Sequence, residues 1–539
     1  MKWRQFIFGI LGGMIFIGNA SATTFYVDVN STNPTPPYTN WSTASTDIQR
    51  AVDASSDGDL ILVTNGIYRT GGRVVYGSLT NRVAINKAVT VQSVNGPTAT
   101  LIQGYKVAGT ITGNNAVRCV YLTNNAVLVG FTLTNGACRS SGNILQEQSG
   151  GGIWCESSTS IVSNCTLSGN TASIYGGGAC GGILLNCTII SNTCPYAEGE
   201  GSAIYNGMIS NCIVIGNQAY QGAAAIYQST AYGSVISSNS GVAVHSVLIG
   251  CLATANFSGP IYCTNYNCIF AWNSRGMFYG IAYNCLVISN TSFFGGGAEY
   301  GSLYNCAVIG NVAHNNGGGV YAAAAFNCII YGNSAPSGSN YYGSTLNYCD
   351  TTPLASGLGN ITNDPAFVSL AGGDYHLQSN SPCINAGNNA AVTSTNDYDG
   401  NPRIVGGTVD IGAYEYQTPS SILSYAWAQQ YGLPTDGSAD FLDSDGTGLN
   451  NWQKWIAGLN PTNAASVFEL QTPAVTVTNA TLTWSSVTNV TYYVQRSSDL
   501  SSPNFSSIQS NLVGQAGFTS YTDTSATNGF NYYYRVGVQ

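Results

Sequence analysis

The sequence predicts an all-β solenoid followed by small C-terminal modules, and one repeated phrase carries most of that prediction. An Asn-Cys pair, alternating apolar residues and a second Asn recur from about residue 164 to residue 349, as in Asn186–Asn192 and Asn211–Asn217. In each copy the second Asn follows the Cys by five residues, and copies begin 17 to 25 residues apart. A fixed period of this length is typical of a solenoid.

Alternation within the repeat assigns its residues to faces, because residues two apart in a strand share a face. Cys187 and Ile189 are expected to point into the core, with Thr188 pointing out. The Asn that ends each copy is expected at a turn, where stacked Asn side chains bond to one another along the axis. Gly-rich runs such as Gly295–Gly297 are expected at another corner, where a positive φ suits glycine. The spacing accommodates three short strands and three turns per coil.

The sixteen cysteines are interpreted mainly as buried thiols, one per coil, and not as a disulfide framework. Occasional bridges stay open among the cysteines outside the column, which are Cys119, Cys138, Cys155, Cys180, Cys194, Cys263 and Cys383. Charged residues make up only 7% of the 539 residues, the net charge is -9, and no Lys/Arg cluster exists. This composition argues against nucleic acid or an anionic membrane as a partner.

Residues 1–22 are predicted to be a secretory signal peptide. Lys2 and Arg4 precede the apolar run Phe6–Ile17, and Ala20-Ser21-Ala22 forms an A-x-A cleavage site. An uncleaved anchor is the alternative, and no later stretch is apolar for long enough to span a membrane. The expected location is extracellular or at the cell surface.

The repeat resembles the right-handed parallel β-helix of the pectate-lyase-like superfamily, which implies that fold for residues 23–362. A short amphipathic helix is expected near its start, with Thr46 and Gln49 forming a capping box. Residues 363–417 carry motifs such as Ser381–Gly387 and Asp410–Glu415 and resemble the choice-of-anchor Q module. That resemblance implies association with the cell envelope. Its polar residues are expected to cap turns.

Residues 418–466 contain an acidic loop that resembles the calcium loops of thrombospondin type 3 and dockerin-like repeats. The resemblance implies Ca²⁺ ligands at positions 1, 3, 5, 7 and 9 of the loop, namely Asp443, Asp445, Thr447, the Leu449 carbonyl and Asn451. Position 12, normally Glu, is Lys454, so Asp436 or Asp440 would have to supply the missing carboxylate. The alternative is a plain Asp/Gly turn that leads into a helix. Residues 467–539 alternate strongly and resemble a fibronectin type III-like β-sandwich.

Few residues in the repeat could perform acid–base chemistry. Between Ile161 and Cys349 the charged residues are Glu198, Glu200, Arg275 and Glu299. Glu198 and Glu200 are the best candidate catalytic pair, and a solvated loop is the alternative interpretation. Arg139, Glu147 and Glu156 flank a second irregular stretch.

An aromatic column precedes the cysteine column by six or seven residues. Its candidate carbohydrate-binding members are Tyr205, Tyr227, Tyr262, Tyr279, Tyr300 and Tyr321. The residues before them, including Ile261, are expected to point inward, which leaves an outward ladder that suits stacking on sugar rings. A ladder that packs only on itself is the alternative. The predicted function is a rigid, non-catalytic scaffold for adhesion or polysaccharide binding, with a β-helix polysaccharide lyase or glycoside hydrolase as the alternative.

Overall fold

The computed structural model describes residues 22–220, 223–500, 504–526 and 531–539. The predicted signal peptide therefore lies outside the described residues, except for Ala22. Among the described residues, no helix is both long and apolar enough to cross a membrane. The chain divides into two compact units, residues 1–188 and 189–539, and each is described separately.

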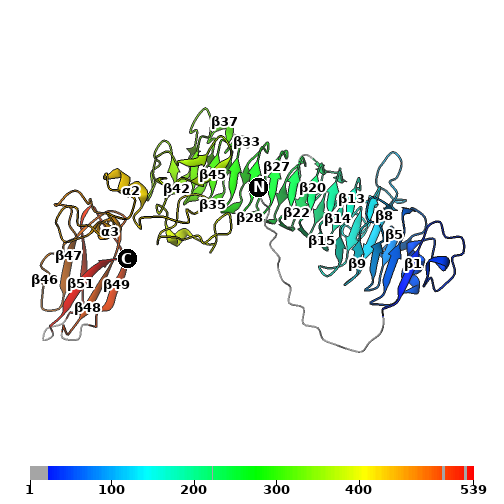
Figure 1. Ribbon diagram of the computed structural model, residues 1–539, viewed down its shortest axis with the longest axis horizontal. Coiled ribbons are helices and arrows are strands. Elements are labelled where there is room, and N and C mark those ends of the chain that lie inside the picture. The colour runs from blue at the N-terminus through cyan, green and yellow to red at the C-terminus, as the bar shows by residue number, and fades with distance from the viewer. Residues whose placement is uncertain (1–21, 221–222, 501–503, 527–530) are drawn as a thin grey trace. The chain divides into compact units, whose positions relative to one another are not determined.

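The first unit is built from coils whose strands pair in parallel with the strands one coil away (Figure 1). Its first sheet contains β1 (Thr24–Val27), β2 (Leu60–Val63), β6 (Thr90–Ser93), β9 (Val127–Val129), β12 (Ile161–Ser163) and β15 (Ile183–Leu185). Its second contains β3 (Gly66–Tyr68), β7 (Thr100–Gln103), β10 (Thr132–Thr134) and β13 (Thr166–Ser168). Its third contains β5 (Thr80–Ile85), β8 (Val117–Leu122), β11 (Ile153–Cys155) and β14 (Ala179–Cys180), with antiparallel β4 (Arg73–Val74) at its edge.

Helix α1 (Ile48–Ala54) packs against β1, β2 and β5 and buries Ile48, as expected. The predicted capping box is wrong. The N-cap is Asp47, whose side chain accepts a hydrogen bond from the Arg50 N–H at 2.9 Å. Gln49 instead reaches β5, where its side chain accepts from the Ala84 N–H at 2.7 Å and donates to the Ala84 carbonyl at 3.1 Å. Satisfying the backbone of a neighbouring strand outweighs the local capping bond here.

The second unit continues the same architecture, and the border between the units falls within β16 (Thr188–Ile190). Sheet 1 of the second unit contains β19 (Met208–Ser210), β23 (Thr230–Tyr232), β26 (Val247–Ile249), β28 (Thr264–Tyr266), β31 (Ile281–Tyr283), β35 (Ser302–Tyr304), β39 (Ala324–Phe326) and β42 (Thr345–Asn347). Sheet 2 contains β20 (Ile213–Ile215), β24 (Val235–Ser237), β27 (Leu252–Thr254), β29 (Ile269–Ala271), β32 (Leu286–Ile288), β36 (Ala307–Ile309), β40 (Ile329–Tyr331) and β43 (Asp350–Thr351).

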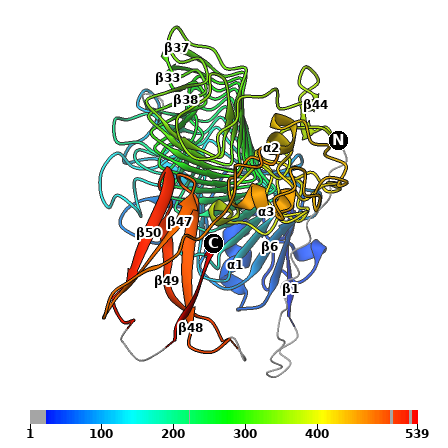
Figure 2. The ribbon, with the colours of Figure 1, turned by 90° about the vertical axis from the view of Figure 1, so that its left-hand side faces the viewer.

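Sheet 3 of the second unit is made of two-residue strands. They are β18 (Ile204–Tyr205), β22 (Ile226–Tyr227) and β25 (Ala243–Val244), then β30 (Met277–Phe278), β34 (Ala298–Glu299), β38 (Val320–Tyr321) and β41 (Tyr341–Tyr342). Short pairs project beyond the coils, namely β17 (Thr193–Cys194) with β21 (Gln218–Ala219), and β33 (Thr291–Phe294) with β37 (Val312–Asn316). Figures 1 and 2 both show β33 and β37 leaving the coil corner together. This set of long parallel sheets is a right-handed parallel β-helix, as predicted.

The cysteine column faces the core, as the alternation predicts. All sixteen cysteines are buried, and they carry thiols in place of disulfides. The column two residues further on is also fully buried, for example at Ile189, Val214 and Phe270. The residue before each column cysteine adopts a positive φ, from 50° to 53° at Asn164, Asn186, Asn211, Asn267, Asn284, Asn305 and Asn327. Asn tolerates this left-handed conformation better than most residues, which explains the recurring Asn-Cys pair.

Residues 363–417 share a core with the β-helix. The outward residues of sheet 2 in the later coils are apolar, and Leu286, Ile309 and Ile329 are at most 4% exposed beneath this segment. Phe367 of β44 (Phe367–Ser369) and Tyr375 of β45 (Asp374–Leu377) belong to the same cluster. A short 3₁₀ helix, η3 (Asn389–Ala391), follows. The segment therefore shields one face of the later coils from water.

A buried charged network fixes this segment internally. The Arg403 guanidinium is 1% exposed and donates to the carbonyls of Ala413, Asp410 and Gly412 at 2.6–3.0 Å. Its Nε lies 4.0 Å from a Glu415 carboxylate oxygen. As expected, several acidic groups here bind turn amides, since Asp410 accepts from the N–H groups of Asn385 and Tyr416.

The C-terminal residues form helices α2 (Tyr425–Gln430) and α3 (Asn451–Ile456), then a small β-sandwich. One antiparallel sheet contains, in order, β46 (Ala474–Val475), β47 (Ala480–Ser486) and β50 (Gly517–Asp523). The other contains β49 (Ser506–Val513), β48 (Thr491–Ser497) and β51 (Tyr533–Val538). Leu482, Trp484, Tyr492 and Val494 are the buried centre of this sandwich. Figure 2 shows β47 and β50 lying side by side.

Candidate functional site

An aromatic ladder runs along the outer face of sheet 1 in the second unit. Tyr266, Tyr283, Tyr304 and Phe326 end strands that pair in register, one coil apart. Their ring centroids lie 5.0, 5.2 and 5.2 Å apart, with interplanar angles of 13°, 20° and 9°. We call these four residues the strand ladder. The sequence analysis missed it, although an aromatic residue stands two positions before Cys268, Cys285, Cys306 and Cys328.

A second ladder lies at the turn that precedes sheet 1. Its members are His245, Tyr262, Tyr279 and Tyr300, with centroid separations of 5.1, 5.3 and 4.8 Å and interplanar angles of 7° to 16°. All four have φ between 49° and 54°. The tyrosines are 50%, 44% and 40% exposed. We call these residues the turn ladder. It contains three of the six tyrosines that the sequence proposed for carbohydrate binding.

The other three proposed tyrosines belong to a different column, which corrects the single ladder expected from the sequence. Tyr205 pairs with Tyr227 in sheet 3, and Tyr321 pairs with Glu299 and Tyr342 there. The sheet 3 tyrosines precede the Cys position by seven residues, and the turn-ladder tyrosines precede it by six. That one-residue difference moves a side chain to another column of the coil.

The expected inward position of Ile261 is wrong for the same reason. Ile261 bridges Val244 and Phe278 in the outward column of sheet 3 and is partly exposed. Met277 and Ala298 fill the inward position of the neighbouring coils and are fully buried. A residue that precedes a turn-ladder tyrosine therefore differs in environment from one that precedes a sheet 3 tyrosine.

The two ladders border an uncharged strip. Between them lie the first residues of the sheet 1 strands, which also point outward, namely Val247, Thr264, Ile281, Ser302 and Ala324. From β26 to β39, none of the outward residues of sheet 1 carries a charge. The outer face of sheet 1 is thus a row of uncharged side chains, and the coils of Thr264, Ile281 and Ser302 have an aromatic ring on both borders.

One ion pair adjoins the turn ladder. Arg275 contacts Glu299 at 3.1 Å, and its guanidinium lies 3.7 Å from the ring centre of Phe278. Phe278 in turn meets Tyr279 edge to face at 4.6 Å and Tyr300 at 6.0 Å. The pair therefore holds Phe278 against two rings of the ladder, with the Glu299 carboxylate 9% exposed and neutralised by Arg275.

Stacking decides which parts of the rings a ligand can reach. Because neighbouring rings cover one another's faces, each ladder presents mainly ring edges and, at the tyrosines, hydroxyl groups. A phenolic hydroxyl both donates and accepts a hydrogen bond. In-register coils repeat these groups about every 4.8 Å along the axis. The arrangement suits a long, hydroxyl-rich polymer that lies parallel to the axis.

The candidate acids Glu198 and Glu200 occupy different environments. Glu198 is exposed, whereas Glu200 is half-buried and accepts a 3.3 Å bond from the Ala224 N–H. Burial raises the pKa of Glu200. No hydrogen bond or ion pair joins the two side chains in the described structure, so the geometry makes no acid–base pair of them.

The first unit contains a separate cluster around Glu156. The Glu156 carboxylate accepts hydrogen bonds from the hydroxyls of Tyr76 and Tyr121 at 2.5 Å and of Thr123 at 2.8 Å. Tyr121 stacks on Trp154 at 5.7 Å. Burial, followed by the Glu156 bond, raises the pKa of Tyr121. The structure thus places Glu156, which the sequence analysis named, beside Trp154 and beside Tyr76 and Tyr121, two tyrosines that the sequence analysis did not name.

Glu147 is tied to the backbone of its own unit. Its carboxylate accepts from the N–H groups of Ser78 and Asn143 at 2.8 and 2.9 Å and lies 3.5 Å from Arg139. The backbone bonds hold the pKa of Glu147 below its usual range. These contacts give Glu147 a structural role.

The calcium-like loop contains its own cation. The Lys454 ammonium, fully buried, donates to the Asp445 carboxylate and lowers the pKa of that group. Asp443 accepts from the N–H groups of Gly446, Thr447 and Gly448 at 2.7–3.1 Å. Among the described residues, no group of three or more His, Cys, Asp or Glu side chains is arranged to hold a metal.

Two other ligand candidates near that loop differ in whether their side-chain oxygens accept hydrogen bonds. Asp440 accepts from the Ser421 hydroxyl at 2.6 Å and the Ile422 N–H at 3.0 Å, so its carboxylate binds the segment before helix α2 in this structure. Asn451 Oδ1 is buried without a hydrogen-bond partner in the described structure. A calcium ion would fit this donor set only after displacing the Lys454 ammonium from Asp445, since two cations repel at such a distance.

Comparison with known proteins gives structural matches alone. Neither the known family models nor the curated proteins match this chain. Among solved structures, the pectate lyase Pel9A aligns with a TM-score of 0.35 and 15% identity, over 73% of this chain and 96% of that one. The A-module of the mannuronan C-5 epimerase AlgE6 from Azotobacter vinelandii aligns with a TM-score of 0.32 and 14% identity, over 59% of this chain and 95% of that one. A rhamnogalacturonan lyase aligns with a TM-score of 0.31 and 12% identity, over 65% of this chain and 92% of that one.

Proposed function

We propose that this protein binds a polysaccharide along the outer face of sheet 1 in its second unit and serves as a rigid, non-catalytic scaffold. The observation that carries the proposal is the pair of aromatic ladders on either side of an uncharged strip. The four-membered turn ladder spans three coil steps, about 14 Å at about 4.8 Å per coil. A polymer that lies along the axis meets equivalent groups at each step.

The uncharged strip supports a hydroxyl-rich ligand over a protein or nucleic-acid partner. Sugar hydroxyls find donors and acceptors in the phenol groups of Tyr262, Tyr279 and Tyr300 and in the hydroxyls of Thr264 and Ser302. The apolar portions of a sugar ring find the edges of the aromatic rings. The strip has no cationic side chain with which to bind phosphates.

The predicted signal peptide, residues 1–22, supports a location outside the cytoplasm, where polysaccharides of envelopes and matrices occur. The resemblance of residues 363–417 to an anchor-associated module supports cell-envelope association and adhesion. Localisation of the protein in its own cell tests both parts of this proposal.

A polysaccharide lyase or glycoside hydrolase is the second candidate. The similar solved structures include enzymes that are named for pectate and rhamnogalacturonan cleavage. In this chain the observation that favours catalysis is the pair of 2.5 Å hydrogen bonds from the Tyr76 and Tyr121 hydroxyls to the Glu156 carboxylate. Carboxylate and phenol groups can act as general acids and bases. A glycoside hydrolase of the usual kind needs two carboxylates on either side of the bond, and the Glu156 cluster supplies one.

One experiment separates the two candidates. The purified protein is incubated with a panel of insoluble and gel-embedded polysaccharides, and retention is measured beside the release of reducing ends and of new double bonds. Retention without cleavage is expected, and replacement of Tyr262, Tyr279 and Tyr300 by alanine is expected to abolish it. Cleavage that disappears in Glu156→Gln would overturn the scaffold proposal in favour of the enzyme.

A further inference from the structure

Two adjoining cavities lie in the second unit where the last coils of the β-helix meet residues 363–455. One has a volume of about 600 Å³ and the other about 650 Å³. Asn363 and Gln429 line both cavities. Their volumes fall within the range of about 300–1,000 Å³ that small-molecule sites occupy. None of the residues that line them belongs to the turn ladder or the strand ladder.

The cavity of about 600 Å³ combines aromatic rings with side-chain amides. Tyr348, Trp427 and Trp455 contribute rings. Asn360, Asn363, Asn385, Gln429 and Gln430 contribute amides, and no residue that lines the cavity is charged. Trp427 meets Tyr431 edge to face at 5.3 Å, which restrains the indole. Such a lining has stacking surfaces and hydrogen-bonding groups but no counter-charge for an ion.

Some of these amides are structural and others are not. Asn360 accepts from the Cys349 N–H at 2.9 Å and donates to the Leu346 carbonyl at 2.8 Å, so it closes the last coil. Asn385 donates to the Ser421 carbonyl at 2.7 Å, but its Oδ1 is buried without a hydrogen-bond partner in the described structure. The side chains of Asn363 and Gln430 bond to no described residue.

We propose that these cavities form a binding site for a neutral oligosaccharide. An aromatic face stacks on the apolar face of a sugar ring, and each amide offers a donor and an acceptor to adjacent hydroxyls. Among the amides of this lining, the side chains of Asn363 and Gln430 have hydrogen-bonding groups left for a ligand. A carboxylated or phosphorylated sugar would find no counter-charge in the lining of the cavity of about 600 Å³, which favours a neutral ligand.

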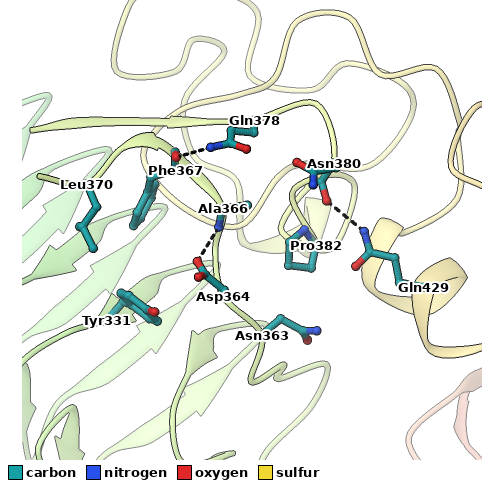
Figure 3. A pocket seen from close by; sticks show the side chains of 10 residues that line it. All are labelled: Tyr331, Asn363, Asp364, Ala366, Phe367, Leu370, Gln378, Asn380, Pro382 and Gln429. Carbon is teal, nitrogen blue, oxygen red and sulfur yellow. Dashed lines mark hydrogen bonds between the residues drawn. The ribbon is translucent and has the colours of Figure 1, made fainter. Parts of the chain in front are cut away.

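The neighbouring cavity extends this site. Figure 3 shows Asn363, Gln378, Asn380 and Gln429 around it, with Tyr331 on one side and Pro382 between the amides. Gln429 donates to the Asn380 carbonyl at 2.9 Å, which leaves its own amide oxygen available to a ligand. The charged residue of this lining, Asp364, accepts from the Ala366 N–H at 3.0 Å in a turn. A second sugar unit of the same ligand would lie here.

Oligosaccharide binding in these cavities does not depend on polysaccharide binding at the outer face of sheet 1, and the following test distinguishes the two sites. Isothermal titration calorimetry on the full chain uses maltose, cellobiose and lactose as neutral probes and digalacturonate as the charged one. At least one neutral disaccharide is expected to bind, and digalacturonate is not. Gln430→Ala is expected to weaken the binding by about tenfold, and Trp427→Ala by at least as much.

Control variants keep the outcome decisive. Tyr279→Ala on the turn ladder and Trp41→Ala on the first unit are expected to leave disaccharide binding unchanged. Thermal unfolding of each variant verifies folding, and Trp427→Phe replaces Trp427→Ala if the latter does not fold. The proposal is overturned if none of the three neutral disaccharides binds. It is equally overturned if Gln430→Ala and the folded Trp427 variant bind as well as the original protein, or if digalacturonate binds more tightly than they do.

Discussion

The side-chain amide of Asn256 donates a 3.0 Å hydrogen bond to the side-chain oxygen of Asn273, one coil further along the axis. The same oxygen accepts the Asn256 backbone N–H at 3.0 Å, and the Asn256 amide also donates to the Ile236 carbonyl at 2.9 Å. Side-chain bonds of this kind at 2.9–3.0 Å link Asn192, Asn217, Asn239, Asn256, Asn273, Asn290, Asn311, Asn333 and Asn340 in turn. The turn that the sequence predicted is therefore a buried, continuous amide ladder.

Interrupting this ladder is expected to destabilise the second unit. Asn273→Leu removes the side-chain oxygen that accepts from both the Asn256 amide and the Asn256 backbone N–H, and it leaves the Ala253 carbonyl without the Asn273 donor. Each buried group that loses its partner costs about 1–3 kcal/mol. Chemical denaturation should show a loss of about 3 kcal/mol or more. Ser274→Ala, at the adjacent exposed residue, serves as the control. Equal stability of the two variants would contradict the claim that the amide ladder stabilises the second unit.

The cysteines are expected to be unreactive while the protein is folded. Burial raises the pKa of Cys119 and Cys180 to about 12 and that of Cys165 to about 11. Since the thiolate is the reactive form and all sixteen cysteines are buried, a thiol reagent such as Ellman's should react with them only after unfolding. The unfolding temperature should not change when a reductant is added. Fewer than sixteen reactive thiols in denaturant without reductant would reveal disulfides.

The solenoid was predictable because its constraints are local and repeated. The pleat places Cys187 and Ile189 on one face wherever the phrase occurs, and each copy repeats the same inference. The strand ladder has the same kind of local signal, which is the aromatic residue two positions before the column cysteines. The six- and seven-residue spacings distinguish the two tyrosine columns, but the spacing alone does not show that the shorter one places Tyr279 in a left-handed turn instead of in sheet 3 with Tyr321.

The C-terminal sites could not be predicted because they join residues that are distant in sequence. The cavity of about 600 Å³ combines Tyr348 with Trp427 and Trp455, and no periodicity relates these positions. The shared core of residues 363–417 had a local signal, since the outward residues of sheet 2 change from Thr188 to Leu286 and Ile309 along the chain. Apolar residues on both faces of a strand indicate that both faces are covered.

The stability of residues 363–417 is expected to depend on pH. Burial raises the pKa of Asp410 to about 7 and that of Glu415 to about 8, above the value of about 4 for exposed carboxyl groups. The folded state therefore holds protons that the unfolded state has lost between about pH 4 and pH 8. The contribution to the free energy of unfolding is complete below about pH 4 and is lost as the pH rises toward 8.

Glu415→Gln tests this dependence, since glutamine cannot titrate. The fall in unfolding free energy between about pH 5 and pH 8 should be shallower in this variant than in the original protein. Glu198→Gln, at an exposed site, should leave the slope unaltered. A slope in Glu415→Gln that equals that of the original protein would show that Glu415 is ionised throughout this range.

Calcium binding by the loop around Asp443 and Asp445 stays a prediction, and Lys454 is the residue that tests it. Because the Lys454 ammonium already neutralises Asp445, millimolar Ca²⁺ or EDTA should shift the unfolding temperature of the original protein little. Lys454→Glu restores the usual ligand at position 12 and should gain several degrees in Ca²⁺ relative to EDTA. A fall of several degrees in EDTA for the original protein would instead show that calcium is bound beside Lys454.

The polysaccharide-binding claim is tested most directly by affinity electrophoresis through polysaccharide-containing gels. The triple variant Tyr262→Ala, Tyr279→Ala, Tyr300→Ala is compared with the original protein and with the control Trp272→Ala, which removes a ring that is 65% exposed at a different turn. At least one polysaccharide should retard the original protein and the Trp272→Ala control, and retardation should fall at least tenfold in the folded triple variant. Equal retardation of all three proteins, or retardation of none by any polysaccharide, would contradict the assignment of binding to the outer face of sheet 1.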